Sequence, residues 1–91
     1  MPHLSFEYSA NLDDQINPSK LCTHLHTAAL ETGMFELGAL RVRAHRCAAV
    51  AVADLLPQNG FLHLTISIGA GRDQSAKETA GAHIWNALTD F

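Results

Sequence analysis

The stretch that decides the fold is residues 2–9, PHLSFEYS. Its apolar side chains alternate with polar ones, Leu4, Phe6 and Tyr8 against His3, Ser5 and Glu7. This period of two is typical of a β-strand with one buried face. Because proline has no backbone N–H to donate to a sheet, Pro2 fits the first position of such a strand. We therefore predict that the chain opens with a half-buried strand.

A helix is predicted over residues 18–32, after a polar connection. Asn17 has the side chain of an N-cap, and Pro18 suits the first helical position. Gly33 stands where a left-handed C-terminal cap is expected. One apolar stripe follows the helical spacing, Leu21, Leu25, Ala28, Ala29 and Thr32. This stripe predicts a helix that packs on the sheet.

Alternation returns in residues 39–47, which predicts a second strand. A strand, a helix and a further strand form a βαβ unit, so we expect these two strands to be parallel. Residues 48–56 read as an irregular or hairpin excursion, and residues 57–60, PQNG, as a turn.

Residues 61–68 give the clearest strand pattern, and Ser75 with Glu78 forms a capping box that predicts the start of a second helix. Its apolar stripe contains Ala76, Ala80, Ile84, Leu88 and Phe91. The predicted fold class is α/β, or α+β in some schemes, with a mixed sheet and two helices on one face.

Composition limits the classes of partner. The 91 residues are 47% apolar and 16% charged, which suggests that part of the surface is buried between subunits. A net charge of −3 with six Lys and Arg residues argues against nucleic acid and anionic membranes as partners. Without a signal peptide pattern or an apolar span, and with Cys22 and Cys47 read as reduced thiols, we expect a cytoplasmic protein.

The second face of the predicted sheet is polar. It would carry His3, Ser5, Glu7, Arg41, Arg43, His45, His63, Thr65 and Ser67. Such a face can contact water, but parallel sheets are rarely open, so we prefer a covering subunit and an ion pair such as Glu7 with Arg43. No metal site is expected, because the histidines, including His24 and His26, lack familiar ligand spacing.

Two further features bear on chemistry. If Met1 is removed, the ring nitrogen of Pro2 becomes a free secondary amine and therefore a titratable base. Residues 69–72, Gly-Ala-Gly-Arg, lie between a strand and a helix. Such a turn can hold an anion with its backbone N–H groups and Arg72, or it is simply a tight turn.

These features together resemble the tautomerase superfamily, and within it most closely the family of 5-carboxymethyl-2-hydroxymuconate isomerases. The resemblance rests on three blocks, PHLSFEYSANL, ETGMFELGALRVRAH and FLHLTISIGAGR, and extends over essentially all 91 residues. It implies one tautomerase-like domain over residues 1–91. Family members continue into another strand after the second helix, so we expect the final strand to be missing from a sequence that ends at Phe91.

The resemblance also implies an activity and a site. Members are trimers without metal or organic cofactor, and they shift a proton within an enol or dienol acid with an N-terminal proline. It assigns Pro2 as catalytic base, and Arg41 and Arg72 as binders of a small-molecule carboxylate substrate, with Arg43 as a further candidate. The implied pathway is homoprotocatechuate degradation.

Two alternatives remain at this stage. The same residues could carry out another reaction of the superfamily, such as hydration, dehalogenation or support of a decarboxylation. The chain could also be a non-catalytic oligomeric module in which Pro2 merely starts a strand.

Overall fold

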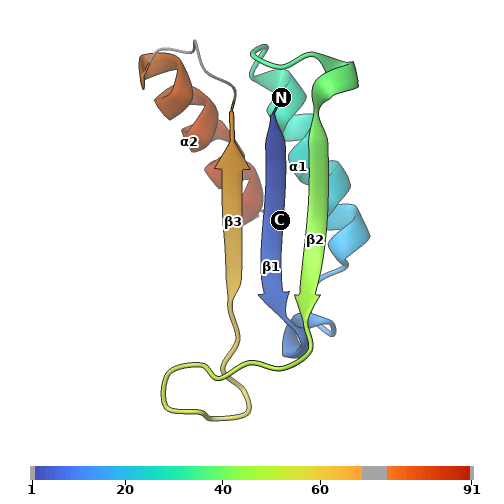
Figure 1. Ribbon diagram of the computed structural model, residues 1–91, viewed down its shortest axis with the longest axis vertical. Helices are drawn as coiled ribbons and strands as arrows, with labels where there is room; N and C mark the ends of the chain where they lie inside the picture. Colours follow the sequence, from blue (N-terminus) through green and yellow to red (C-terminus); the bar gives the residue numbers. More distant parts are fainter. Residues whose placement is uncertain (1, 69–73, 91) are drawn as a thin grey trace.

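The computed structural model describes residues 2–68 and 74–90, and in them the first strand lies at the centre of a three-stranded sheet. The strands are β1 (His3–Ser9), β2 (Arg41–Cys47) and β3 (Leu62–Ser67), in the order β2-β1-β3. The helices are α1 (Pro18–Glu31) and α2 (Gln74–Asp90), and short 3-10 turns cover Ala10–Leu12 and Leu37–Ala39. Both long helices lie on the same side of the sheet (Figure 1).

The sheet is mixed, as predicted. β1 and β2 are parallel and joined through α1, whereas β1 and β3 are antiparallel. Leu4 is opposite Val42 and Ile66, and the face that these residues share is apolar except for Arg46, which is opposite Tyr8. The predicted α/β class with helices on one face is confirmed.

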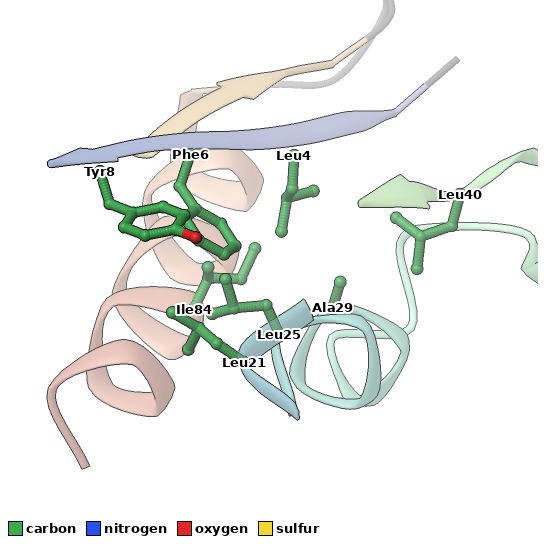
Figure 2. Close-up of a cluster of buried hydrophobic side chains, with 8 residues drawn as sticks. All are labelled: Leu4, Phe6, Tyr8, Leu21, Leu25, Ala29, Leu40 and Ile84. Atoms are coloured by element: carbon green, nitrogen blue, oxygen red, sulfur yellow. The ribbon is translucent and has the colours of Figure 1, made fainter. Parts of the chain in front are cut away.

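The apolar face of β1 forms the centre of the core (Figure 2). Leu4 and Phe6 are fully buried, and Tyr8 is only 3% exposed. They point toward Leu21 and Leu25 of α1 and Ile84 of α2. Because β1 is the middle strand, its side chains contact both helices, and the core is built around it.

The ends of α1 follow from the residues predicted to cap it. The Asn17 side chain accepts a hydrogen bond from the backbone N–H of Lys20 at 3.1 Å, and Pro18 is the first helical residue. Gly33 has a φ of +72°, a conformation that L residues with a side chain adopt at a cost. The helix ends at Glu31, one residue before its predicted end.

The predicted start of α2 is wrong in detail. The helix already includes Gln74, so Ser75 lies within it and is not its N-cap. Glu78 instead accepts a hydrogen bond from the side chain of Gln74 at 3.2 Å, one turn away. Ala80 and Ile84 of the predicted stripe are buried, while Phe91 lies outside the described residues.

The segment between β2 and β3 is irregular, which is one of the two forms predicted for it. Side-chain amides fix its course: Asn11 donates to the carbonyl oxygens of Pro57 and Asn59, and Asn59 donates to that of Val52. Leu55 has a φ of +69° and a side chain that is 69% exposed. Among the described helices, none has the length and apolar character needed to cross a bilayer.

Candidate active site

The candidate site lies at the Pro2 end of the sheet face that no described helix covers. Three rows of side chains cross this face. His3, Arg41 and Ser67 form the first row, Ser5, Arg43 and Thr65 the second, and Glu7, His45 and His63 the third. The arginines therefore lie in the two rows nearest Pro2, and the only carboxylate of these rows lies in the third.

Pro2 itself is buried, directly before the first residue of β1. Its carbonyl oxygen accepts a hydrogen bond from the backbone N–H of Arg41 at 3.2 Å. Parallel pairing of β1 with β2 thus brings the predicted base and a predicted binding arginine together, although 39 positions separate them in the sequence.

The Arg41 guanidinium is held by the backbone just before β2. Its Nη1 donates to the carbonyl oxygens of Gly38 and Leu40, at 2.9 and 3.0 Å. The Nε and Nη2 hydrogens are bonded to no described residue, and the side chain is exposed. Such an Nε and Nη2 pair can bind a carboxylate through two parallel hydrogen bonds. Arg41 also borders a shallow cavity of about 440 Å³ beside α1, with Cys22, Thr23, His26, Leu40 and Val42.

Arg43 contacts His3, a residue that the sequence pattern assigns to this face but for which it predicts no role. Its Nη1 lies 3.0 Å from Nδ1 of His3. The expected ion pair with Glu7 is not formed: Arg43 is opposite Ser5, with His3 and Glu7 each one row away, and its guanidinium contacts His3. The position of His3, directly after Pro2 and on the polar face, is the signal that could have identified it.

Arg72 and the Gly-Ala-Gly-Arg turn of residues 69–72 lie outside the described residues. Within residues 2–68 and 74–90, no three or more His, Cys, Asp and Glu side chains are grouped closely enough to hold a metal ion. Both cysteines are free thiols, and burial raises the pKa of Cys22, so this thiol is a poor nucleophile at neutral pH.

Three further pKa shifts belong to a cluster at the opposite end of β1 from Pro2. Arg46 Nε donates to Asp13 Oδ2 at 2.7 Å, and this hydrogen bond is the main cause of a lowered pKa of Asp13. The same contact raises the pKa of Arg46. Burial raises the pKa of Tyr8, and the nearby Asp13 carboxylate adds to this. Tyr8 and Arg46 are in the strand rows of the helix-covered face, and Asp13 lies in the segment before α1, so this cluster is not part of the open face.

Replacing Asp13 by asparagine is expected to make the free energy of unfolding less dependent on pH in the acidic range. A carboxyl whose pKa is lowered by folding stabilises the native state above its unfolded pKa and loses that contribution as the pH falls through the folded value. The stability advantage of wild type over Asp13→Asn should therefore shrink below about pH 4. Urea unfolding between pH 7 and pH 2.5 measures it. Asp14→Asn is the control, since this exposed neighbour forms no ion pair with a described residue; an advantage that is independent of pH would contradict the expectation.

Comparison with known proteins identifies the family of this chain. A model of the family described as 5-carboxymethyl-2-hydroxymuconate isomerase matches residues 2–91. The 5-carboxymethyl-2-hydroxymuconate Delta-isomerase of Escherichia coli is 28% identical over 88 residues, which cover 97% of this chain and 70% of that protein.

Two solved structures are similar over nearly all of this chain. A 5-carboxymethyl-2-hydroxymuconate delta-isomerase superposes with a TM-score of 0.93 at 30% identity, covering 99% of this chain and 70% of that one. A 5-carboxymethyl-2-hydroxymuconate isomerase from Deinococcus radiodurans R1 gives a TM-score of 0.89 at 36% identity, covering 98% and 67%. The chain belongs to the 5-carboxymethyl-2-hydroxymuconate isomerase family and is an isomerase.

Proposed function

We propose that this isomerase shifts a proton within an unsaturated 2-hydroxy acid with two or three carboxylates, such as 5-carboxymethyl-2-hydroxymuconate. The base is the secondary amine of Pro2 once Met1 has been removed, and no metal or organic cofactor takes part. The observation that carries the proposal is the burial of Pro2 and its backbone pairing with Arg41, beside an open face with two arginines. Relatives named for this reaction support the choice of substrate.

The proposed base must be largely unprotonated at neutral pH, where a general base is most effective. Burial disfavours the charged ammonium form of an amine, and neighbouring guanidinium groups do the same by repulsion. Both effects act in the direction that this role requires. The amine can therefore take the proton from the 2-hydroxyl group of the dienol and return it to a carbon atom of the conjugated chain.

The proposed role of the arginines is to bind and stabilise negative charge on the substrate. As the hydroxyl proton leaves, negative charge develops on the oxygen atom and spreads over the conjugated chain. Arg41, with Nε and Nη2 hydrogens bonded to no described residue, can bind this oxygen or the adjacent carboxylate. Arg43 and Arg72 are proposed to bind the remaining carboxylates, Arg72 on the strength of the family resemblance alone.

We also propose that the protein works as a cytoplasmic homotrimer in homoprotocatechuate degradation. The polar sheet face has no cover among the described residues, and neither β2 nor β3 has a second strand neighbour there. Val50, Leu55 and Leu56 expose apolar side chains on the segment between these strands. Subunits of one kind can cover such surfaces in a closed assembly.

The Arg41→Ala variant tests the role of the site. If Arg41 stabilises the developing charge, its loss should cost about 2–4 kcal/mol of transition-state stabilisation, a fall in kcat/KM of roughly 30- to 1000-fold. The assay follows the ultraviolet absorbance of 5-carboxymethyl-2-hydroxymuconate during isomerisation. Arg46→Ala is the matched control, because that arginine lies on the helix-covered face and pairs with Asp13. Equal kcat/KM values for the two variants would mean that Arg41 does not stabilise the transition state.

A further inference from the structure

The contact between His3 and Arg43 has a geometry that local strand pairing does not require. Arg43 is opposite Ser5 in the register, and His3 is opposite Arg41. The two side chains nevertheless bridge one row, with Nη1 of Arg43 3.0 Å from Nδ1 of His3. The guanidinium of the second row is thereby joined to a side chain of the first row, the one nearest Pro2.

The chemistry of the two groups fixes their roles in this contact. A guanidinium only donates hydrogen bonds, so Nδ1 of His3 must be the acceptor. A neutral imidazole that accepts at Nδ1 carries its proton on Nε2. A contact of this kind selects one tautomer and one orientation of the histidine, and it restricts a long arginine side chain that would otherwise move freely over an exposed strand.

Arg41 is oriented in the same direction by different partners. Its Nη1 is bound to the carbonyl oxygens of Gly38 and Leu40, which precede β2. Both guanidinium groups are therefore bonded to groups on the Pro2 side of their own rows. Two oriented guanidinium groups on one side of a base suit an acid with two separated carboxylates, since each carboxylate can bind one of them.

We propose that His3 is a positioning residue for Arg43: by accepting at Nδ1, it holds the Arg43 guanidinium at the Pro2 end of the open face, where it binds a second carboxylate of the substrate. This inference rests on the proposed function, because it names the residue that orients one binding group of that same site. His3 takes no part in the proton transfer. Its loss should change substrate binding and leave the chemical step largely unaltered.

Steady-state kinetics of His3 and Arg43 variants, alone and combined, test the inference. His3→Leu, which lacks an acceptor, should raise KM for 5-carboxymethyl-2-hydroxymuconate on the order of tenfold, with kcat nearly unchanged. His3→Asn keeps an acceptor oxygen close to the position of Nδ1, so its KM should stay near the wild-type value. In an Arg43→Met background, His3→Leu should have no further effect, because its only action is on Arg43. An unchanged KM for His3→Leu, or an equal rise in both backgrounds, would overturn the proposal.

A substrate comparison separates positioning from general damage to the site. With a 2-hydroxy-2,4-dienoate that carries a single carboxylate, wild type and His3→Leu should have the same KM. A tenfold rise with this substrate as well would mean that His3 acts on the whole site and not through the second carboxylate.

Binding and spectroscopy keep the inference testable without activity. If wild type with Pro2 at its N-terminus does not isomerise the substrate, the proposed function fails. The affinity for muconate, a dicarboxylate, measured by calorimetry, then replaces KM: His3→Leu should weaken it on the order of tenfold and His3→Asn should not. Long-range ¹H–¹⁵N correlation spectra should show His3 with its proton on Nε2. Equal affinities, or a proton on Nδ1, would contradict the proposal.

Discussion

Replacing Pro2 by alanine is expected to lower kcat/KM for 5-carboxymethyl-2-hydroxymuconate by about 10²- to 10⁴-fold, the usual contribution of a general base. Alanine would still supply an α-amino group, but a primary amine that no ring holds in place. A base that is not positioned loses most of its effectiveness, because each turnover must first pay the entropy of orienting it. The rate is measured by ultraviolet absorbance, with intact mass verifying the N-terminus of each protein.

The fold should tolerate this change. The hydrogen bond between Pro2 and Arg41 uses the carbonyl oxygen of residue 2, which alanine retains. Circular dichroism and urea unfolding of Pro2→Ala should therefore match those of wild type, so that a loss of rate can be assigned to chemistry. A folded Pro2→Ala protein with wild-type kcat/KM would remove Pro2 from the mechanism.

Phe6→Ala is expected to lower the free energy of unfolding by about 3–5 kcal/mol, the usual cost of removing a buried aromatic side chain. Phe6 is fully buried on the central strand and belongs to the cluster that joins β1 to both helices. The neighbouring strands and helices cannot all move inward to fill the space, so the variant should keep a cavity. Urea unfolding monitored by circular dichroism measures the loss.

Two further variants calibrate this value. Phe6→Leu leaves a smaller cavity and should cost clearly less than Phe6→Ala. Leu37→Ala removes an apolar side chain that is 66% exposed, so its effect should stay within about 0.5 kcal/mol. A loss for Phe6→Ala no larger than that for Leu37→Ala would mean that β1 is not the centre of the core.

The regular elements could be predicted because their residues carry local signals. The strand pattern of residues 2–9 became β1, that of residues 61–68 became β3, and Asn17, Pro18 and Gly33 marked the ends of α1 to within one residue. The capping-box prediction was wrong for a local reason too. Ser75 and Glu78 have the right spacing, but the helix already includes Gln74, and Glu78 lies one turn after Gln74 and binds its side chain.

The pairing of side chains on the open face could not be predicted. A period of two assigns His3, Glu7 and Arg43 to one face, but it does not give the register between strands that are distant in the sequence. The register places Arg43 opposite Ser5, with His3 and Glu7 each one row away, and in the structure the Arg43 guanidinium contacts His3, whereas charge had suggested Glu7.

The roles of the candidate site residues came from family resemblance and not from pattern. Alternation gave no reason to single out Arg41 over Arg43, and a proline at a strand start has a purely structural explanation. What the structure adds is physical: Pro2 is buried, and it lies beside Arg41 through backbone pairing. Arg72 lies outside the described residues, so its role remains a prediction from the resemblance.

The most direct test of the central claim compares two forms of the protein that differ only at the N-terminus. Protein that retains Met1 and protein from which Met1 has been removed are separated, verified by intact mass and assayed with 5-carboxymethyl-2-hydroxymuconate. Retained Met1 converts the Pro2 nitrogen into an amide, which is not a base. We predict that isomerase activity is confined to the protein that begins at Pro2, and equal activity of the protein that retains Met1 would contradict the account.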